Sequence, residues 1–207
     1  MTYPDRHVAG AVLATRLGAY AGRADAVVLG LVRGGVPVAA ELARHLRVPL
    51  DVLVVRKLGV PWSPEVAFGA LGPGDVQVLN DDVAAQLEPD EIAAVVRRES
   101  AELRRREKLF RLRRPALDLA GKTALIVDDG VATGATARAA VAVARKLDAA
   151  RVVVVAPVGS ADAVAQLNTL ADEVMCLVAP DDFGSVSRFY RDFRQISDDE
   201  VVRLLGH

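Results

Sequence analysis

The stretch Thr123-Ala-Leu-Ile-Val-Asp-Asp-Gly-Val-Ala-Thr-Gly-Ala-Thr136 contains the pattern that decides the fold. It begins with an uninterrupted apolar run, which is typical of a strand buried on both faces of a parallel sheet. It continues through small and hydroxyl-bearing residues into a helical pattern over Ala135–Leu147. A buried strand that leads directly into a helix predicts one strand–helix unit of an α/β sheet.

The same alternation recurs along the chain. Apolar runs without polar alternation predict buried strands over Ala26–Val32, Leu50–Val55, Ala124–Val127, Arg151–Val155 and Val174–Val178. Helical patterns between them cover Val36–Leu46, Ala135–Leu147 and Ala161–Leu170. Strands and helices in this order predict an α/β fold with a doubly wound, mainly parallel sheet.

Two segments depart from the alternation. Leu58–Gly74 is rich in proline and glycine, so we expect a loop or hairpin that projects from the sheet. A short strand over Val76–Leu79 follows it, and Asp90–Leu112 predicts one long, charged helix.

The C-terminus differs in composition from the rest of the chain. Four aromatic residues fall within eleven positions there: Phe183, Phe189, Tyr190 and Phe193. We therefore expect one domain over residues 1–207, with a core at about residues 25–180. A small hood subdomain is expected from residue 181 to 207, with a contribution from the N-terminus.

Composition limits the classes of protein. The chain has 207 residues, of which 52% are hydrophobic, and a net charge of −1, which gives no general attraction to nucleic acid or anionic membranes. Glutamates interleave with the basic residues of Arg97–Arg114, so nucleic acid is not the expected partner of that segment. A single cysteine, Cys176, suits a reducing compartment, and no apolar run approaches the roughly 20 residues that span a bilayer. We expect a cytoplasmic protein with no membrane partner.

Two adjacent carboxylates, Asp128 and Asp129, follow the strand before residue 128. Ligands of open α/β sheets bind beyond the carboxyl ends of the strands. Adjacent carboxylates repel each other unless a cation or hydroxyl donors neutralise them, and Mg²⁺ prefers such oxygens. Asp128 and Asp129 are therefore predicted to bind Mg²⁺ and the diol of a sugar. The alternative is an ordinary strand–helix junction with solvated acids and Thr133 as the helix N-cap.

Small residues and backbone N–H groups follow the acid pair at the start of a helix. This arrangement favours phosphate, because the helix dipole and the free N–H groups both attract anions. The predicted anion cradle consists of Gly130, Val131, Ala132, Thr133, Gly134, Ala135 and Thr136.

A second glycine-rich motif, Gly30-Leu-Val-Arg-Gly-Gly-Val-Pro-Val-Ala39, follows the first predicted strand. Gly34 and Gly35 free the backbone to face an anion, and Arg33 adds a charged fork. A glycine turn with a solvated arginine is the alternative interpretation of this motif taken alone.

Both motifs resemble those of the type I phosphoribosyltransferases. Val127–Thr136 is similar to that family's signature for 5-phosphoribosyl 1-pyrophosphate, and Gly30–Ala39 resembles its pyrophosphate loop. The resemblance implies that Asp128 and Asp129 take the ribose hydroxyls beside Mg²⁺ and that residues 132–136 surround the 5′-phosphate. It also implies a non-proline cis peptide at Val32–Arg33.

The whole chain is most similar to small, stand-alone bacterial members of this family. Shared segments are Val55–Gly59, Pro64–Ala70 and the aromatic C-terminus. The resemblance implies a glycosyltransferase that moves phosphoribose from 5-phosphoribosyl 1-pyrophosphate to a nitrogenous, nucleobase-like acceptor, and it makes a homodimer a fair expectation.

The resemblance to this family also implies which residues take part in catalysis. Arg33, Lys57 and Arg56 are the candidate cations for the leaving pyrophosphate. Purine-salvage members carry an acidic base where this chain has Ala132, which argues against a hypoxanthine or guanine acceptor. Glu65 is the substitute candidate base, although it also suits the first turn of a short helix after Ser63.

The aromatic C-terminus could stack on an acceptor, with Phe183 and Tyr190 as the contacts and Phe189 and Phe193 in the core. Two other functions stay open: a sensor that binds the donor without turning it over, and a hydrolase of a phosphorylated ribose. The sequence does not identify the acceptor.

Overall fold

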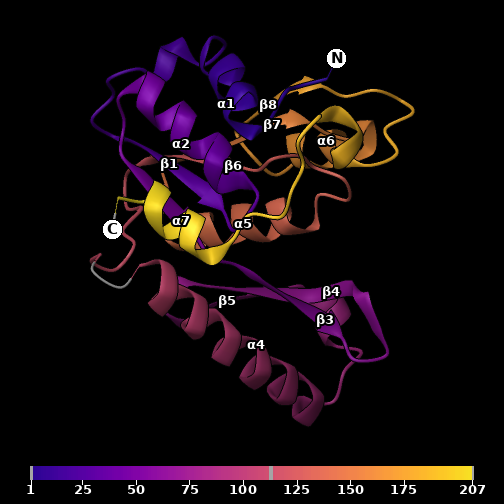
Figure 1. The fold of residues 1–207 in the computed structure, drawn as a ribbon. Coiled ribbons are helices and arrows are strands. Elements are labelled where there is room, and N and C mark those ends of the chain that lie inside the picture. The colour runs from indigo at the N-terminus through magenta and orange to yellow at the C-terminus, as the bar shows by residue number, and fades with distance from the viewer. Residues whose placement is uncertain (1, 112–113, 207) are drawn as a thin grey trace.

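The computed structural model describes residues 2–111 and 114–206 (Figure 1). Its strands are β1 Ala26–Leu31, β2 Leu50–Leu53, β3 Arg56–Val60, β4 Ser63–Gly72, β5 Val76–Leu79, β6 Thr123–Val127, β7 Arg151–Val158 and β8 Glu173–Val178. Its α-helices are α1 Arg6–Ala14, α2 Gly35–Leu46, α3 Asp81–Ala84, α4 Pro89–Phe110, α5 Ala135–Lys146, α6 Ala161–Asn168 and α7 Asp198–Leu204.

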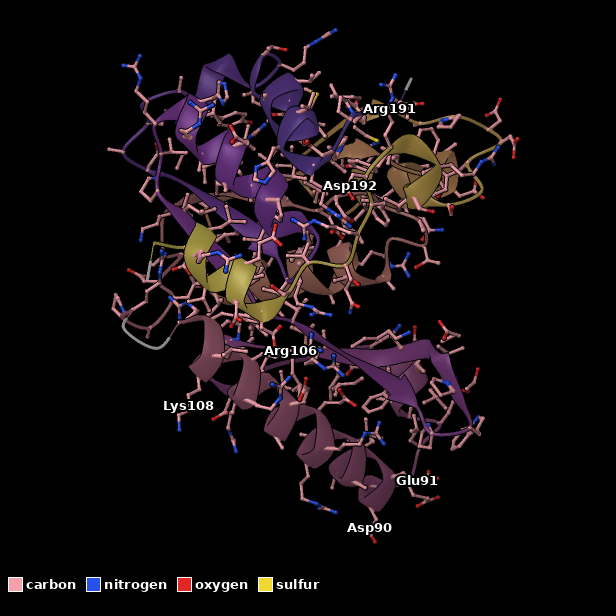
Figure 2. The ribbon with its side chains drawn as sticks, in the orientation of Figure 1. Asp90, Glu91, Arg106, Lys108, Arg191 and Asp192 are labelled. Carbon is pink, nitrogen blue, oxygen red and sulfur yellow. The ribbon has the colours of Figure 1, made fainter. Side chains whose placement is uncertain are left out.

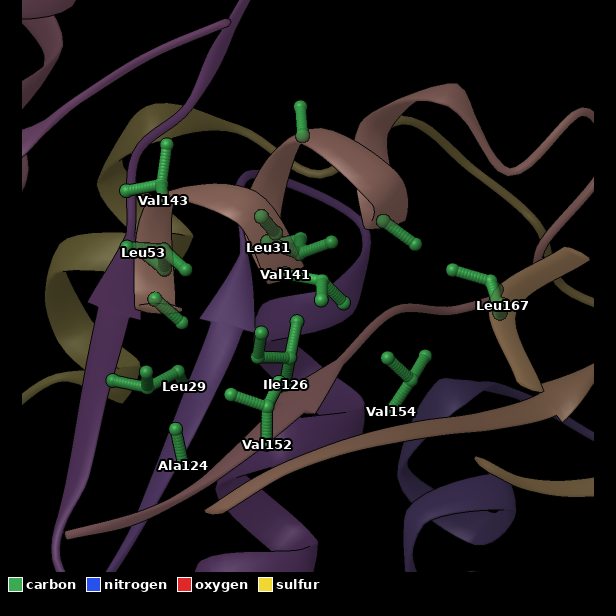
Figure 3. Close-up of a cluster of buried hydrophobic side chains, with 14 of the residues drawn as sticks. Leu29, Leu31, Leu53, Ala124, Ile126, Val141, Val143, Val152, Val154 and Leu167 are labelled. Atoms are coloured by element: carbon green, nitrogen blue, oxygen red, sulfur yellow. The ribbon is translucent and has the colours of Figure 1, made fainter. Parts of the chain in front are cut away.

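The main sheet has the strand order β2-β1-β6-β7-β8, and its neighbouring strands all pair in parallel. One face packs on α1 and α2, and the other packs on α5 and α6. Figure 3 shows the second of these interfaces, where Leu29, Ile126 and Val154 of the sheet meet Val141 and Leu167 of the helices. The predicted doubly wound, mainly parallel α/β fold is confirmed.

A small antiparallel sheet, β3-β4-β5, lies beside the main sheet (Figure 1). The buried side chains of Leu58 and Phe68 pack with Leu103 of α4, so the long helix closes the apolar face of the small sheet. The expected hairpin and the strand over Val76–Leu79 are both confirmed.

The long helix predicted over Asp90–Leu112 is α4, and Leu112 lies outside the described residues. Asp90 and Glu91 occupy its first turn and Lys108 its last, as the helix dipole favours (Figure 2). Figure 2 also places Arg106 on the side of α4 that faces the rest of the chain.

Helices α1 and α7 were not expected from the sequence. The side chains of Asp5 and Ser197 cap them, accepting hydrogen bonds from Val8 and Glu200 respectively, and such caps were a readable signal. The expectation of a single domain with a hood from residue 181 to 207 stays a prediction, and residue 207 lies outside the described chain.

The N-terminal residues run beside residues 189–192 of the C-terminal segment, which precede α7. The amide of Tyr3 donates to the carbonyl of Phe189 at 2.7 Å, and the amide of Arg191 donates to the carbonyl of Tyr3 at 2.9 Å. This pairing brings α1 and the C-terminal segment to the carboxyl edge of the main sheet. In the part of the chain that the structure describes, no helix is both long and apolar enough to cross a membrane.

Candidate active site

The two sequence motifs meet at the point where the strand order reverses. Strands β1 and β6 are neighbours in the sheet, with Gly30 beside Val127, but the chain continues from β1 to one side and from β6 to the other. The loops that follow these strands therefore diverge and leave a crevice, which is where ligands of such sheets bind.

The two loops touch through glycine backbone. A Cβ on Gly35 would overlap the carbonyl oxygen of Val127, and a Cβ on Gly34 would overlap the carboxylate of Asp129. At Gly35 the close approach of two backbone segments requires glycine, whereas a Cβ at Gly34 would force the Asp129 carboxylate to move. The peptide between Val32 and Arg33 is cis, as the resemblance implied.

The acid pair lies in this crevice. The Oδ1 atom of Asp128 accepts the backbone N–H of Asp129 at 2.9 Å. Burial, and next the neighbouring Asp129 carboxylate, raises the pKa of Asp128 well above its ordinary value. Burial also raises the pKa of Asp129, although a hydrogen bond from Arg6 opposes this shift. A cation or hydroxyl donors would relieve the cost of keeping both groups ionised.

That hydrogen bond comes from a residue that the sequence did not single out. Arg6 begins α1, and its Nε donates to Oδ2 of Asp129 at 2.8 Å. Its side chain is 8% exposed and that of Asp129 is 13% exposed, so solvent screens this ion pair poorly. No local motif marks Arg6, because its partner is 123 positions away.

The residues after the acid pair form the expected cradle. A cavity of about 170 Å³ is lined by Asp128 and by residues 130–137. Gly134 precedes α5 with φ +73°, a conformation that suits glycine, and the first turn of α5 borders the cavity. Ser160 Oγ, another residue missed by the sequence analysis, donates to the carbonyl of Ala132 at 2.7 Å and ties the loop to α6.

A second cavity, of about 490 Å³, lies between the main sheet and the small sheet. Its lining includes Val32 of the cis peptide, Thr136 of the cradle, and Lys57 and Glu65 of the hairpin. The Nζ of Lys57 lies 3.6 Å from a carboxylate oxygen of Glu65, whose side chain is 95% exposed. The structure therefore brings Lys57 and Glu65 to the edge of the same crevice.

The other two candidate cations have partners. Arg33 lies 3.6 Å from Oδ1 of Asp198, at the start of α7. Arg56 donates through Nε and Nη2 to one oxygen of the buried Glu99, at 2.8 and 2.6 Å. Arg33 is half-exposed and could turn to an anion, whereas Arg56 joins the small sheet to α4.

The aromatic residues are arranged differently from the expectation. Phe183 and Tyr190, the expected ligand contacts, are buried, and Phe189 and Phe193 are partly exposed. Tyr190 nevertheless reaches the site, because its hydroxyl donates to the backbone carbonyl of Asp129 at 2.6 Å.

The order of the main sheet and the small antiparallel sheet beside it define the type I phosphoribosyltransferase fold. A family model described as a phosphoribosyl transferase domain matches residues 6–194. The chain therefore belongs to the phosphoribosyl transferase domain family.

Individual proteins agree with this assignment. A protein found in two strains of Mycobacterium tuberculosis, whose name assigns it provisionally to the phosphoribosyl transferases, is 54% identical over 205 residues. The match covers 98% of this chain and 46% of that protein, so the chain spans about half the length of these curated relatives. The solved structure of TT1426 from Thermus thermophilus is 42% identical with a TM-score of 0.92, and the match covers 99% of this chain and 98% of TT1426.

Proposed function

We propose that this protein is a Mg²⁺-dependent pentosyltransferase. It moves phosphoribose from 5-phosphoribosyl 1-pyrophosphate to a nitrogenous, nucleobase-like acceptor and releases pyrophosphate. The observation that carries the proposal is the arrangement at the switch point of the sheet. A partly buried acid pair lies between a glycine loop after β1 and a small-residue cradle at the start of α5.

Each part of the donor has a matching group. The cradle at residues 130–136 suits the 5′-phosphate, because a helix N-terminus and small side chains favour close contact with an anion. Asp128 and Asp129 suit the ribose hydroxyls, which donate to carboxylates. The loop of Arg33, Gly34 and Gly35 suits the pyrophosphate, and Lys57, which lines one cavity with the preceding Val32, is the candidate to neutralise charge on it.

The residues present fit Mg²⁺. This ion is usually held by one or two carboxylates together with water and substrate phosphates. The partly buried carboxylate of Asp128 accepts a backbone N–H, whereas the nearby guanidinium of Arg6 bonds to Asp129. Asp128, with Asp129 beside it, would hold the ion, which would supply positive charge for the departing pyrophosphate.

The acceptor would enter beside the hairpin. Glu65 is the candidate base for a proton on the attacking nitrogen, and the 490 Å³ cavity that it borders has the size of an ordinary small-molecule site. A cytoplasmic location and a homodimer also belong to this proposal, and light scattering on the purified protein tests the second.

The experiment is a pyrophosphate-release assay with 5-phosphoribosyl 1-pyrophosphate, Mg²⁺ and a panel of purines, pyrimidines and small amines. Release that depends on one acceptor and disappears in an Asp128→Asn/Asp129→Asn variant supports the transferase and identifies the acceptor. Donor binding without release supports a sensor, and release with water alone supports a hydrolase. If the wild-type protein does not bind the donor, the proposal is wrong.

A further inference from the structure

Arg6 is held rigidly beside the acid pair. Its side chain packs over the ring of Phe193, with the guanidinium carbon 3.9 Å from the ring centre. While Nε donates to Asp129, Nη1 donates to the carbonyl of Arg194 at 2.9 Å. These contacts with the C-terminal segment fix the plane of the guanidinium group, which an arginine can use for directed hydrogen bonds.

The backbone around Arg6 is fixed as well. Asp5 caps the first turn of α1, and Tyr3 pairs with the C-terminal segment through two backbone hydrogen bonds. The start of α1 therefore cannot shift without breaking the backbone hydrogen bonds between Tyr3 and residues 189–191. The position of Arg6 beside Asp129 therefore depends on contacts between distant segments of the chain and not on a loop near the acid pair.

The contacts make the two carboxylates unequal. Asp129 is confined on several sides, because its carboxylate meets Arg6 and the backbone of Gly34, and its own carbonyl accepts the hydroxyl of Tyr190. Asp128 has the backbone N–H of Asp129 as its hydrogen-bond donor. A cation or hydroxyl that enters the crevice would therefore find Asp128 more available than Asp129.

We propose that Arg6 is a positioning residue that holds Asp129 against the loop of Gly34, and that Asp128 is the carboxylate more available to the cation and hydroxyls of the donor. This inference rests on the proposed function, because the ligand is the donor named there. In this arrangement Asp129 joins the two loops of the site, and the N-terminal helix completes a site otherwise built from the ends of β1 and β6.

The test measures the affinity of 5-phosphoribosyl 1-pyrophosphate with Mg²⁺ by calorimetry. The proteins compared are the wild type, Arg6→Met, Asp129→Asn, the double variant and Asp128→Asn. Arg16→Met is the matched control, since Arg16 is an exposed arginine just after the same helix. Arg6→Lys keeps the charge but lacks the fork that reaches both Asp129 and the carbonyl of Arg194. Thermal unfolding of each variant is recorded in parallel.

We expect Arg6→Met to weaken donor binding at least about tenfold, as loss of a charged hydrogen bond does. In the Asp129→Asn background the same change should alter binding by less than about twofold, because residues that act through one another are not additive. Arg6→Lys should restore part of the affinity, and Arg16→Met should bind as the wild type does. Asp128→Asn should weaken binding more than Asp129→Asn.

Three results would overturn the inference while the proposed function stands. The first is a wild-type affinity in Arg6→Met, and the second is an equal loss with and without Asp129. The third is an effect of Asp129→Asn as severe as that of Asp128→Asn. If Arg6→Met does not fold, Arg6→Lys with and without Asp129→Asn gives the same comparison. A wild-type protein that binds no donor would instead remove the proposed function, and this inference with it.

Discussion

The carboxylate of Asp129 lies directly against the Cα atom of Gly34, in the space that a side-chain methyl group would fill. The glycine loop after β1 and the acid pair are thus in contact. This contact makes Asp129 part of both motifs that the sequence presents separately.

Replacing Gly34 with alanine should separate the two loops. The added methyl group would displace the Asp129 carboxylate, and overpacking of this kind costs about 1–3 kcal/mol. We expect lower stability in urea unfolding and at least a tenfold loss of donor affinity. Gly18→Ala is the control, because a Cβ there meets no atom within 4 Å. Unchanged donor binding in Gly34→Ala would contradict the close contact of the loops.

A buried ion pair joins α4 to the main sheet. Arg111 donates through Nε and Nη2 to the two oxygens of Asp51, at 3.1 and 3.0 Å, and also to the carbonyl of Pro115. Arg111→Met should lower the free energy of unfolding by about 3 kcal/mol, because it leaves a buried carboxylate with a weaker partner. The exposed pair of Arg23 and Asp25 is the control, and Arg23→Met should change stability far less. Equal effects in chemical denaturation would argue against a special role for Arg111.

The single cysteine should react slowly. Burial raises the pKa of the Cys176 thiol to about 11, and the thiol donates a hydrogen bond to the carbonyl of Val178. Because the thiolate is the nucleophile, alkylation by iodoacetamide should be slow at pH 8 and rise with pH until about 11. The raised pKa also means that the thiol stabilises the fold fully at neutral pH and loses this contribution as the pH rises through 11. A rate at pH 8 equal to that of free N-acetylcysteine would show that the thiol is accessible.

Tyr190→Phe tests the bond between the C-terminal segment and the acid pair. The variant keeps the ring but loses the hydrogen bond to the carbonyl of Asp129, which should cost about 1 kcal/mol of stability. Donor binding should weaken too, because the backbone of Asp129 becomes less constrained. Tyr3→Phe, whose hydroxyl lies 3.5 Å from the carbonyl of Pro157, should have the smaller effect. If the two variants lose the same stability and donor affinity in calorimetry, the hydrogen bond to Asp129 contributes no more than the one to Pro157.

Glu65→Gln tests the candidate base, provided that an acceptor is found. If Glu65 removes a proton in the transition state, kcat should fall at least about 100-fold while donor affinity is retained. Lys57→Met should instead act mainly on steps that involve pyrophosphate, because Lys57 lines the cavity together with Val32. An activity within about twofold of the wild type in Glu65→Gln would assign the proton transfer to another group.

Much of this structure was predictable from local sequence. The apolar runs predicted the strands of the main sheet, because a strand buried on both faces needs apolar residues in succession. The glycine pair at residues 34 and 35 was predictable for a similar reason, since a close backbone contact excludes side chains. The sequence also predicted that the acid pair and the start of the next helix lie close together at the end of one strand.

Other features depended on contacts between distant segments. The sequence did not predict Arg6, because its ion pair joins residues 123 positions apart and an isolated arginine in a helix carries no local signal. It also did not predict that the hydroxyl of Tyr190 donates to the carbonyl of Asp129, because these residues are 61 positions apart.

The sequence by itself therefore determined the strands, the helix that follows the acid pair and the chemical character of both loops, since these depend on residues within one turn or strand. The tertiary structure decided which carboxylate is confined and which is available. That difference arises because α1, the loop after β1 and the C-terminal segment all meet Asp129, and such a meeting exists only once the whole chain has folded.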